Sequence, residues 1–114
     1  MKNYSGTRAF EKEFRRLLKK YKSLENDLER FKKVLSVAPT GIGKHFISIH
    51  TSQDFIIIKA HLACRYLRNN HSLRIIYAYF KKEDRIEFIE LYFKGDKENE
   101  DYQRIKEYIK GTHH

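Results

Sequence analysis

The chain has 114 residues, which is enough for one domain with a modest core of helices on a sheet and too few for two domains. Hydrophobic residues make up 40% of the sequence and include eight Tyr and eight Phe, which argues against a disordered chain. Lys and Arg outnumber Asp and Glu by 24 to 15, and the resulting formal charge of +9 attracts nucleic acid, an anionic membrane surface or an acidic protein, or simply serves solubility.

Cys64 is the only cysteine. No disulfide can therefore form within the chain, which fits a reducing cytoplasm, and its strand-like neighbours favour a core role over a catalytic one. No apolar run approaches the ~18 residues of a membrane span, and the first residues lack the apolar centre of a signal peptide. We expect a cytoplasmic protein with no membrane partner and a single domain over residues 1–112. Residues 113–114, both histidines, could be native or the start of an affinity tag.

The first third of the sequence has helical periodicity. Apolar residues recur at helical spacing over residues 10–21, with Lys and Arg between them, and Thr7 is a suitable N-cap. Ser23 is a suitable N-cap for a second helix, which Pro39 ends. The apolar stripe of that helix consists of Leu24, Leu28, Phe31 and Leu35. Two amphipathic helices joined by a few residues predict an antiparallel helical hairpin whose stripes pack into the core.

Four later stretches are rich in Ile, Phe and Tyr and are separated by short polar turns, which is typical of strands. They cover residues 45–50, 55–66, 73–80 and 85–94. Each turn is short enough for a hairpin, so we predict an antiparallel meander, to which the residues around Tyr4 can add a short edge strand.

A last helix is predicted over residues 99–110. Tyr102, Ile105 and Ile109 share one of its faces, which favours core packing, and Gly111 is a natural stop. The predicted fold class is therefore α+β: an N-terminal helical hairpin packed on an antiparallel sheet of about four strands, with a C-terminal helix.

Two short motifs fail as ligand sites. Residues 41–44, Gly-Ile-Gly-Lys, suggest a phosphate loop, but a full P-loop needs Gly at position 38 and Ser or Thr at position 45, where the chain has Ala38 and His45. His45 and His50 lack the helical spacing of a zinc protease pair, and no nearby Cys or acidic residue completes a metal set. We therefore expect no metal and no cofactor.

Basic residues gather on one face of the predicted sheet, because side chains alternate between the faces of a strand. If the last hairpin turns near Glu83, Arg74 lies opposite Tyr92; if the hairpin before it turns near residues 69–70, Arg65 lies opposite Arg74. The resulting basic cluster consists of Lys59, His61, Arg65, Arg74, Tyr92 and Lys94. The opposite face carries Ile58, Ala60, Leu62, Ile75, Leu91 and Phe93, which we expect the helical hairpin to cover.

Like charges placed close together repel, so folding alone does not favour such a cluster. A bound anion relieves the repulsion, Arg suits phosphate, and Tyr can stack on an unpaired base. The alternative is a solvated basic face that pairs with acidic side chains such as Glu90.

Several segments resemble one known family. Residues 74–77 are Arg-Ile-Ile-Tyr in a predicted middle strand, and residues 89–94 are Ile-Glu-Leu-Tyr-Phe-Lys in the last strand. The first helix opens with Thr7-Arg8-Ala9-Phe10 and continues with Phe14, Leu17, Leu18, Lys19 and Lys20. Together with the order of the elements, these residues resemble the RelE/ParE superfamily of bacterial type II toxins over nearly the whole chain.

The resemblance implies a RelE-like toxin domain: a ribosome-dependent mRNA endoribonuclease that is neutralised by a cognate antitoxin. In that family the concave face of the sheet binds mRNA in the ribosomal decoding site. The ribose 2′-hydroxyl attacks the adjacent phosphate and leaves a 2′,3′-cyclic phosphate, while arginines and lysines stabilise the charge that develops. We expect the antitoxin to present an extended, acidic and apolar segment, because this chain is strongly basic.

By resemblance, Arg74 matches the family's Arg before an aliphatic pair and a Tyr, and is implied as the phosphate clamp. Lys59 and His61 match basic positions on the preceding strand, and either could be the general base, His61 having the more suitable intrinsic pKa. Arg65 supplies a second positive charge. The implied RNA-binding residues are Arg65, Arg74, Tyr92 and Lys94.

The end of the last strand departs from the family pattern. Tyr92 and Lys94 match its functional end, but many members have Arg or His where this chain has Lys94. Several members have a further Tyr just beyond, for which Tyr102 is a candidate, although its helical spacing favours core packing. Two alternatives therefore stay open: a ParE-like toxin that acts on DNA gyrase, and a basic RNA-binding domain without chemistry.

Overall fold

The computed structural model describes residues 3–67 and 72–112; residues 1–2, 68–71 and 113–114, which include the histidines of the suggested tag, lie outside it. The elements are β1 (Asn3–Gly6), α1 (Arg8–Lys20), α2 (Leu24–Val37), β2 (Phe46–Thr51), β3 (Ile56–Ala63), β4 (Ser72–Phe80), β5 (Arg85–Phe93) and α3 (Tyr102–Thr112). The predicted α+β class is confirmed. No helix within the described residues has the length and apolar character needed to cross a membrane.

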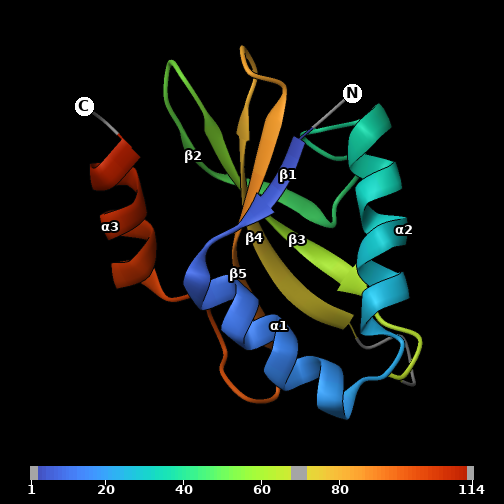
Figure 1. The fold of residues 1–114 in the computed structure, drawn as a ribbon. Coiled ribbons are helices and arrows are strands. Elements are labelled where there is room, and N and C mark those ends of the chain that lie inside the picture. The colour runs from blue at the N-terminus through green and yellow to red at the C-terminus, as the bar shows by residue number, and fades with distance from the viewer. Residues whose placement is uncertain (1–2, 68–71, 113–114) are drawn as a thin grey trace.

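The strands form one sheet in the order β1-β5-β4-β3-β2 (Figure 1). Strands β2 to β5 are the predicted antiparallel meander. Strand β1, around Tyr4, is the predicted edge strand, and it pairs with β5 in parallel. Among the described residues the sheet therefore has five strands and is mixed, rather than purely antiparallel with about four.

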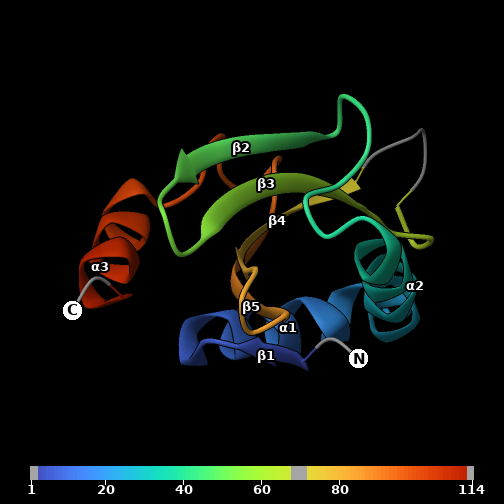
Figure 2. The ribbon, with the colours of Figure 1, turned by 90° about the horizontal axis from the view of Figure 1, so that it is seen from above.

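Helices α1 and α2 pack together on one face of the sheet (Figure 2). Both predicted apolar stripes are buried there, and they cover the predicted apolar sheet residues Ile58, Ala60, Leu62, Ile75 and Leu91, with Phe93 partly buried at the margin. Burying one large apolar side chain contributes roughly 1.5–3 kcal/mol, so this layer is the main source of stability.

The start of α2 differs from the prediction. Thr7 caps α1 as expected, since its hydroxyl accepts a hydrogen bond from Phe10 N. The Ser23 hydroxyl does not cap α2 but donates to Asp27 and accepts from Tyr66 N. The chain that follows β3 lies against this helix and supplies partners that a local pattern cannot reveal. Asp27 is 2% exposed and holds both segments together.

Helix α3 covers only part of the opposite face. Its Ile105 packs against Ile57, Ile76 and Ile89, and Arg104 anchors it by hydrogen bonds to Glu13. The prediction that Tyr102 packs in the core is wrong: the helix begins at this residue, whose side chain is 59% exposed. The helix also continues through Gly111 to Thr112. No helix of residues 3–67 and 72–112 covers the rest of this sheet face, and the basic residues lie there.

Leu35→Ala is expected to lower the free energy of unfolding by about 2–5 kcal/mol, because a large side chain is removed from a closed core. Leu35 is 0% exposed. Val37→Ala is the matched control on the same helix, since Val37 is 83% exposed and should change stability by less than about 0.5 kcal/mol. Urea unfolding measures both variants, and equal losses would contradict this packing.

Candidate functional site

Four side chains lie side by side across the sheet, on the face away from α1 and α2. Arg74 on β4 pairs with Tyr92 on β5 and with His61 on β3. The backbone N–H of His61 donates to the carbonyl of His45 at 3.0 Å, which extends the β2–β3 ladder by one pair. Directly opposite residues in such ladders have Cβ atoms about 4.5–5.5 Å apart. We call His45, His61, Arg74 and Tyr92 the cross-strand row.

A cavity of about 400 Å³ lies at this row. Its lining consists of His45, His61, Ser72, Arg74, Phe93, Lys94 and Gly95. The Arg74 guanidinium is turned towards this end of the sheet, because it donates to the hydroxyl and carbonyl oxygens of Ser72 at 2.9 and 3.3 Å. No carboxylate is among these lining residues, so the cavity has the electrostatic character of an anion site.

His61 is half-buried among cations. Burial is the main cause that lowers its pKa, and the nearby charges of Arg74, His45, Lys94 and Lys59 add to it, so that the pKa falls to about 4. The imidazole is therefore neutral near pH 7 and has a nitrogen that can accept a proton. This is the protonation state that a general base requires.

This low pKa predicts that the protein loses stability as the pH falls from about 6.5 to about 4. The unfolded imidazole, with an ordinary pKa of about 6.5, takes up its proton first, so the contribution of His61 is present above that pH and lost below it. Urea midpoints at about pH 7 and pH 4.5 measure the effect. His61→Gln should show a smaller difference between the two pH values, and an unchanged difference would contradict the account.

Lys59 lies two residues from His61 on the same face and is held by a carboxylate. Its ammonium nitrogen is 2.8 Å from Glu100 Oε1, and the Glu100 side chain is only 9% exposed. Burial lowers the pKa of Lys59, but the hydrogen bond with Glu100 and the nearby Tyr92 outweigh it, and the pKa is raised. A lysine in this state is a cation and a poor proton acceptor.

Tyr92 is covered by the segment between β5 and α3. Its side chain is 2% exposed, and the Lys97 ammonium lies 5.0 Å from the centre of its ring. Lys97 also forms an ion pair with the buried Glu90, which accepts a hydrogen bond from Asp101 N at 3.0 Å. Burial raises the pKa of the Tyr92 phenol, and the neighbouring Lys59 ammonium lowers it only in part. A base can stack on this ring only if the covering segment moves.

Arg65 is not in the row. Strand β3 ends at Ala63, which pairs with Ser72, so the hairpin is centred two residues earlier than predicted, and His61 rather than Arg65 faces Arg74. The shift moves the partner by an even number of residues, which keeps the predicted face. Arg65 is exposed, and its backbone N–H donates to Asp27.

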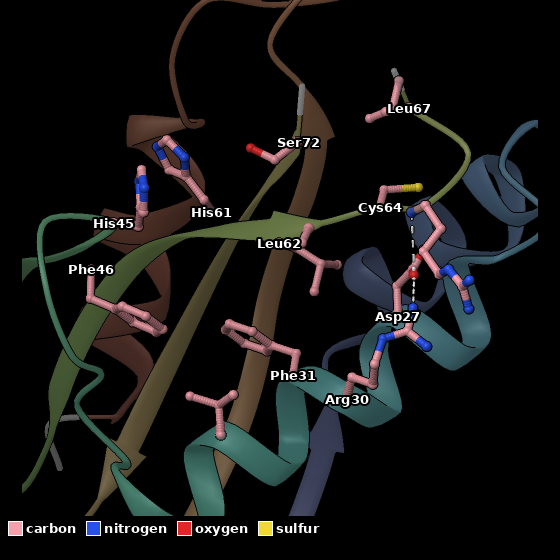
Figure 3. A pocket seen from close by; sticks show the side chains of 13 residues that line it. Asp27, Arg30, Phe31, His45, Phe46, His61, Leu62, Cys64, Leu67 and Ser72 are labelled. Atoms are coloured by element: carbon pink, nitrogen blue, oxygen red, sulfur yellow. Dashed lines mark hydrogen bonds and ion pairs between the residues drawn. The ribbon is translucent and has the colours of Figure 1, made fainter. Parts of the chain in front are cut away.

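Arg65 instead lines a second cavity of about 780 Å³, which extends from the row towards α2. Figure 3 shows His45 and His61 close together on one side of β3, and Asp27 and Arg30 on α2 on the other side. The two cavities share His45, His61 and Ser72. The second cavity therefore adjoins the basic row at these three residues, and its lining is partly apolar.

Two members of the site were missed by the sequence prediction. His45 was considered only in the rejected phosphate-loop and metal-ligand motifs, although pairing about the predicted turn at residues 51–54 places it opposite residue 60 or 61. Glu100 lies 41 residues from its partner Lys59, and no local pattern reveals that contact. Among the described residues, no three His, Cys, Asp or Glu side chains are grouped so that they could hold a metal ion.

Sequence comparison finds no matching family model and no matching curated protein. Comparison of structures finds an archaeal RelE–RelB complex from Pyrococcus horikoshii OT3. The match has a TM-score of 0.61 and 19% sequence identity, and it covers 82% of this chain and 94% of the other. At this identity the similarity concerns the fold, which agrees with the resemblance seen in the sequence. The chain has a RelE-like fold.

Proposed function

We propose that this protein is the toxin of a type II toxin–antitoxin system and cuts mRNA on the ribosome, in the cytoplasm. The observation that carries the proposal is the position of Arg74 between His61 and Tyr92, at a cavity without carboxylates. A phosphate held by the central Arg would have the imidazole of His61 as a proton acceptor on one side, while Tyr92 on the other side lies beneath the covering segment. The RelE-like fold supports the same reading.

The chemistry follows from these positions. The 2′-oxygen of the ribose forms a bond to phosphorus, its proton passes to the neutral imidazole of His61, and the bond from phosphorus to the 5′-oxygen breaks as that oxygen takes up a proton from solvent water. Arg74 and Lys94 stabilise the negative charge that develops on the phosphate oxygens. The products are a 2′,3′-cyclic phosphate and a free 5′-hydroxyl.

Few acid–base groups serve this site, since Lys59 is held by Glu100 and Tyr92 is covered. We therefore expect naked mRNA to be cut slowly and translated mRNA rapidly, because the ribosome would supply the positioning of the 2′-oxygen. Cleavage assays with purified protein, with and without ribosomes, measure the ratio of the two cleavage rates. Equal rates on naked and translated mRNA would contradict ribosome dependence.

The proposed partner is a cognate antitoxin with an acidic and apolar segment. The structurally similar RelE is in a complex with RelB, and this chain combines a charge of +9 with exposed apolar side chains. These are Val34, Val37, Ile42 and Ile47. Co-expression with the product of the neighbouring gene should give a complex that survives purification, and no complex would count against this partner.

The contacts of Lys59 and Tyr92 favour a second candidate. Glu100 forms an ion pair with Lys59, and such pairing of a basic residue with a carboxylate is expected on a binding face without catalysis. Such a face would belong to an RNA-binding domain or to a ParE-like inhibitor of DNA gyrase. Induced expression followed by primer extension on a translated mRNA separates the candidates. Growth arrest with new cuts supports the ribonuclease, whereas arrest without cuts supports the binding protein.

A further inference from the structure

The two histidines of the cross-strand row form a close pair, of which the proposed reaction uses only His61. The ring centroids of His45 and His61 lie 4.4 Å apart, and the planes are tilted by 37°. His61 belongs to β3, and His45 immediately precedes β2 and is exposed. Both line the 400 Å³ cavity, and the backbone hydrogen bond between them fixes their relative position.

The charges that face this pair come from every neighbouring element. Strand β3 contributes Lys59, β4 contributes Arg74, and Lys94 follows β5. The Lys59 charge is offset by Glu100, which lies just before α3, and Lys97 is offset by Glu90. The charges left without a described ion-pair partner are those of Arg74 and Lys94, and both line the cavity.

A proton on the His61 imidazole is therefore disfavoured while the cavity is empty, because it adds a third positive charge beside those of Arg74 and Lys94. The low pKa of His61 agrees with this geometry. A dianion in the cavity reverses the balance, since it attracts the added proton and neutralises the two cations. Linkage is reciprocal, so an anion that favours protonation is itself bound more tightly when the proton is present.

We propose that a phosphate group enters this cavity together with one proton, which the close His45–His61 pair takes up, and that His45 is a phosphate-contacting residue. The protonated ring donates to a phosphate oxygen, and the neutral ring keeps a nitrogen that can accept the 2′-hydroxyl proton. The inference deepens the proposed function by adding His45 to its site and by coupling substrate binding to proton uptake. The anion binding itself needs no RNA cleavage.

Sulfate is a suitable probe, because it is a tetrahedral dianion that does not itself titrate near neutral pH. The imidazole ring-proton signals of the full chain are followed by NMR at about pH 6, with and without sulfate. Spectra of His45→Asn, His61→Asn and His50→Asn assign them. We expect sulfate to move the signals of His45 and His61 towards the protonated form and to leave that of His50 unchanged.

Calorimetry in buffers of different ionisation enthalpy counts the protons. Uptake should approach one proton per sulfate. At pH values above those at which the sulfate-bound histidine pair loses its proton, the affinity for sulfate should fall by up to tenfold per pH unit, which is about the limit for one linked proton. His45→Asn should weaken sulfate binding at least about threefold, and the double variant of His45 and His61 should lose the uptake. His50→Asn is the control for both the affinity for sulfate and the proton uptake, because His50 lies on β2, the strand that His45 immediately precedes.

An absence of sulfate binding, binding without proton uptake, or an unmoved His45 signal would each overturn the inference. A protein that cuts no RNA but binds sulfate with proton uptake would retain the inference and lose the proposed function. A protein that cuts translated mRNA while sulfate leaves both histidines unchanged would retain the function and lose the inference.

Discussion

Arg74→Ala is expected to lower cleavage of translated mRNA by about 10²–10³-fold, the loss seen when one donor to a developing oxyanion is removed. The guanidinium is at the centre of the cross-strand row, and Ser72 fixes its direction. Among the residues that the structure describes, no other Arg lies in the row, since Arg65 lies beyond the end of β3. Primer extension on a translated mRNA after induced expression gives the yield of cuts, and growth gives the toxicity.

Arg16→Ala is the matched control, because Arg16 is exposed on α1, which packs on the opposite face of the sheet. It removes the same charge from the protein and should leave both cuts and growth arrest as in the wild type. Undiminished cleavage by Arg74→Ala would refute the phosphate clamp. An equal loss in both variants would show that only overall charge matters.

His61→Ala is expected to lower cleavage by about 10²–10⁴-fold, the usual contribution of a positioned general base. Its imidazole is neutral near pH 7, whereas the Lys59 ammonium is occupied by Glu100. Lys59→Ala should therefore lower cleavage less than His61→Ala does, on the order of tenfold, because it removes one charge near the phosphate that Glu100 already partly offsets. Single-turnover cleavage of a ribosome-bound mRNA measures both variants.

The comparison of these two variants decides which residue accepts the proton. If Lys59→Ala loses the larger factor, the lysine is the base and Glu100 serves to position it. Circular dichroism should show that both variants remain folded, because neither residue lies in the core that α1 and α2 cover.

Part of the site could be predicted because one turn is short and its centre is nearly fixed. The β4–β5 turn is centred half a residue before Glu83, since Phe80 pairs with Arg85, and a bulge further along β5 restores the predicted pairing of Arg74 with Tyr92. The β3–β4 connection is longer and fixes its centre poorly, so the sequence placed Arg65 where the structure has His61. The correct face survived only because the error was an even number of residues.

A β-bulge and the position of α3 explain other differences between the predicted and the observed site. Simple alternation groups Ile89 with Leu91, but a bulge opposite Ile76 and Tyr77 adds a residue to β5 and places Ile89 in the cluster under α3. The contact between Glu100 and Lys59 depends on where α3 docks, which hydrophobic periodicity does not define. The helical hairpin was predicted well, since its two stripes have regular spacing and bury as the pattern requires.

The central claim is that an RNA phosphate binds at the cross-strand row. The most direct measurement is an NMR titration of the isotope-labelled protein with a short RNA whose reacting 2′-hydroxyl is replaced by hydrogen, so that it binds without being cut. The account predicts the largest amide shifts at His45, His61, Arg74 and Lys94, and their loss in Arg74→Ala. Shifts centred on α1 and α2, or no binding at all, would contradict it.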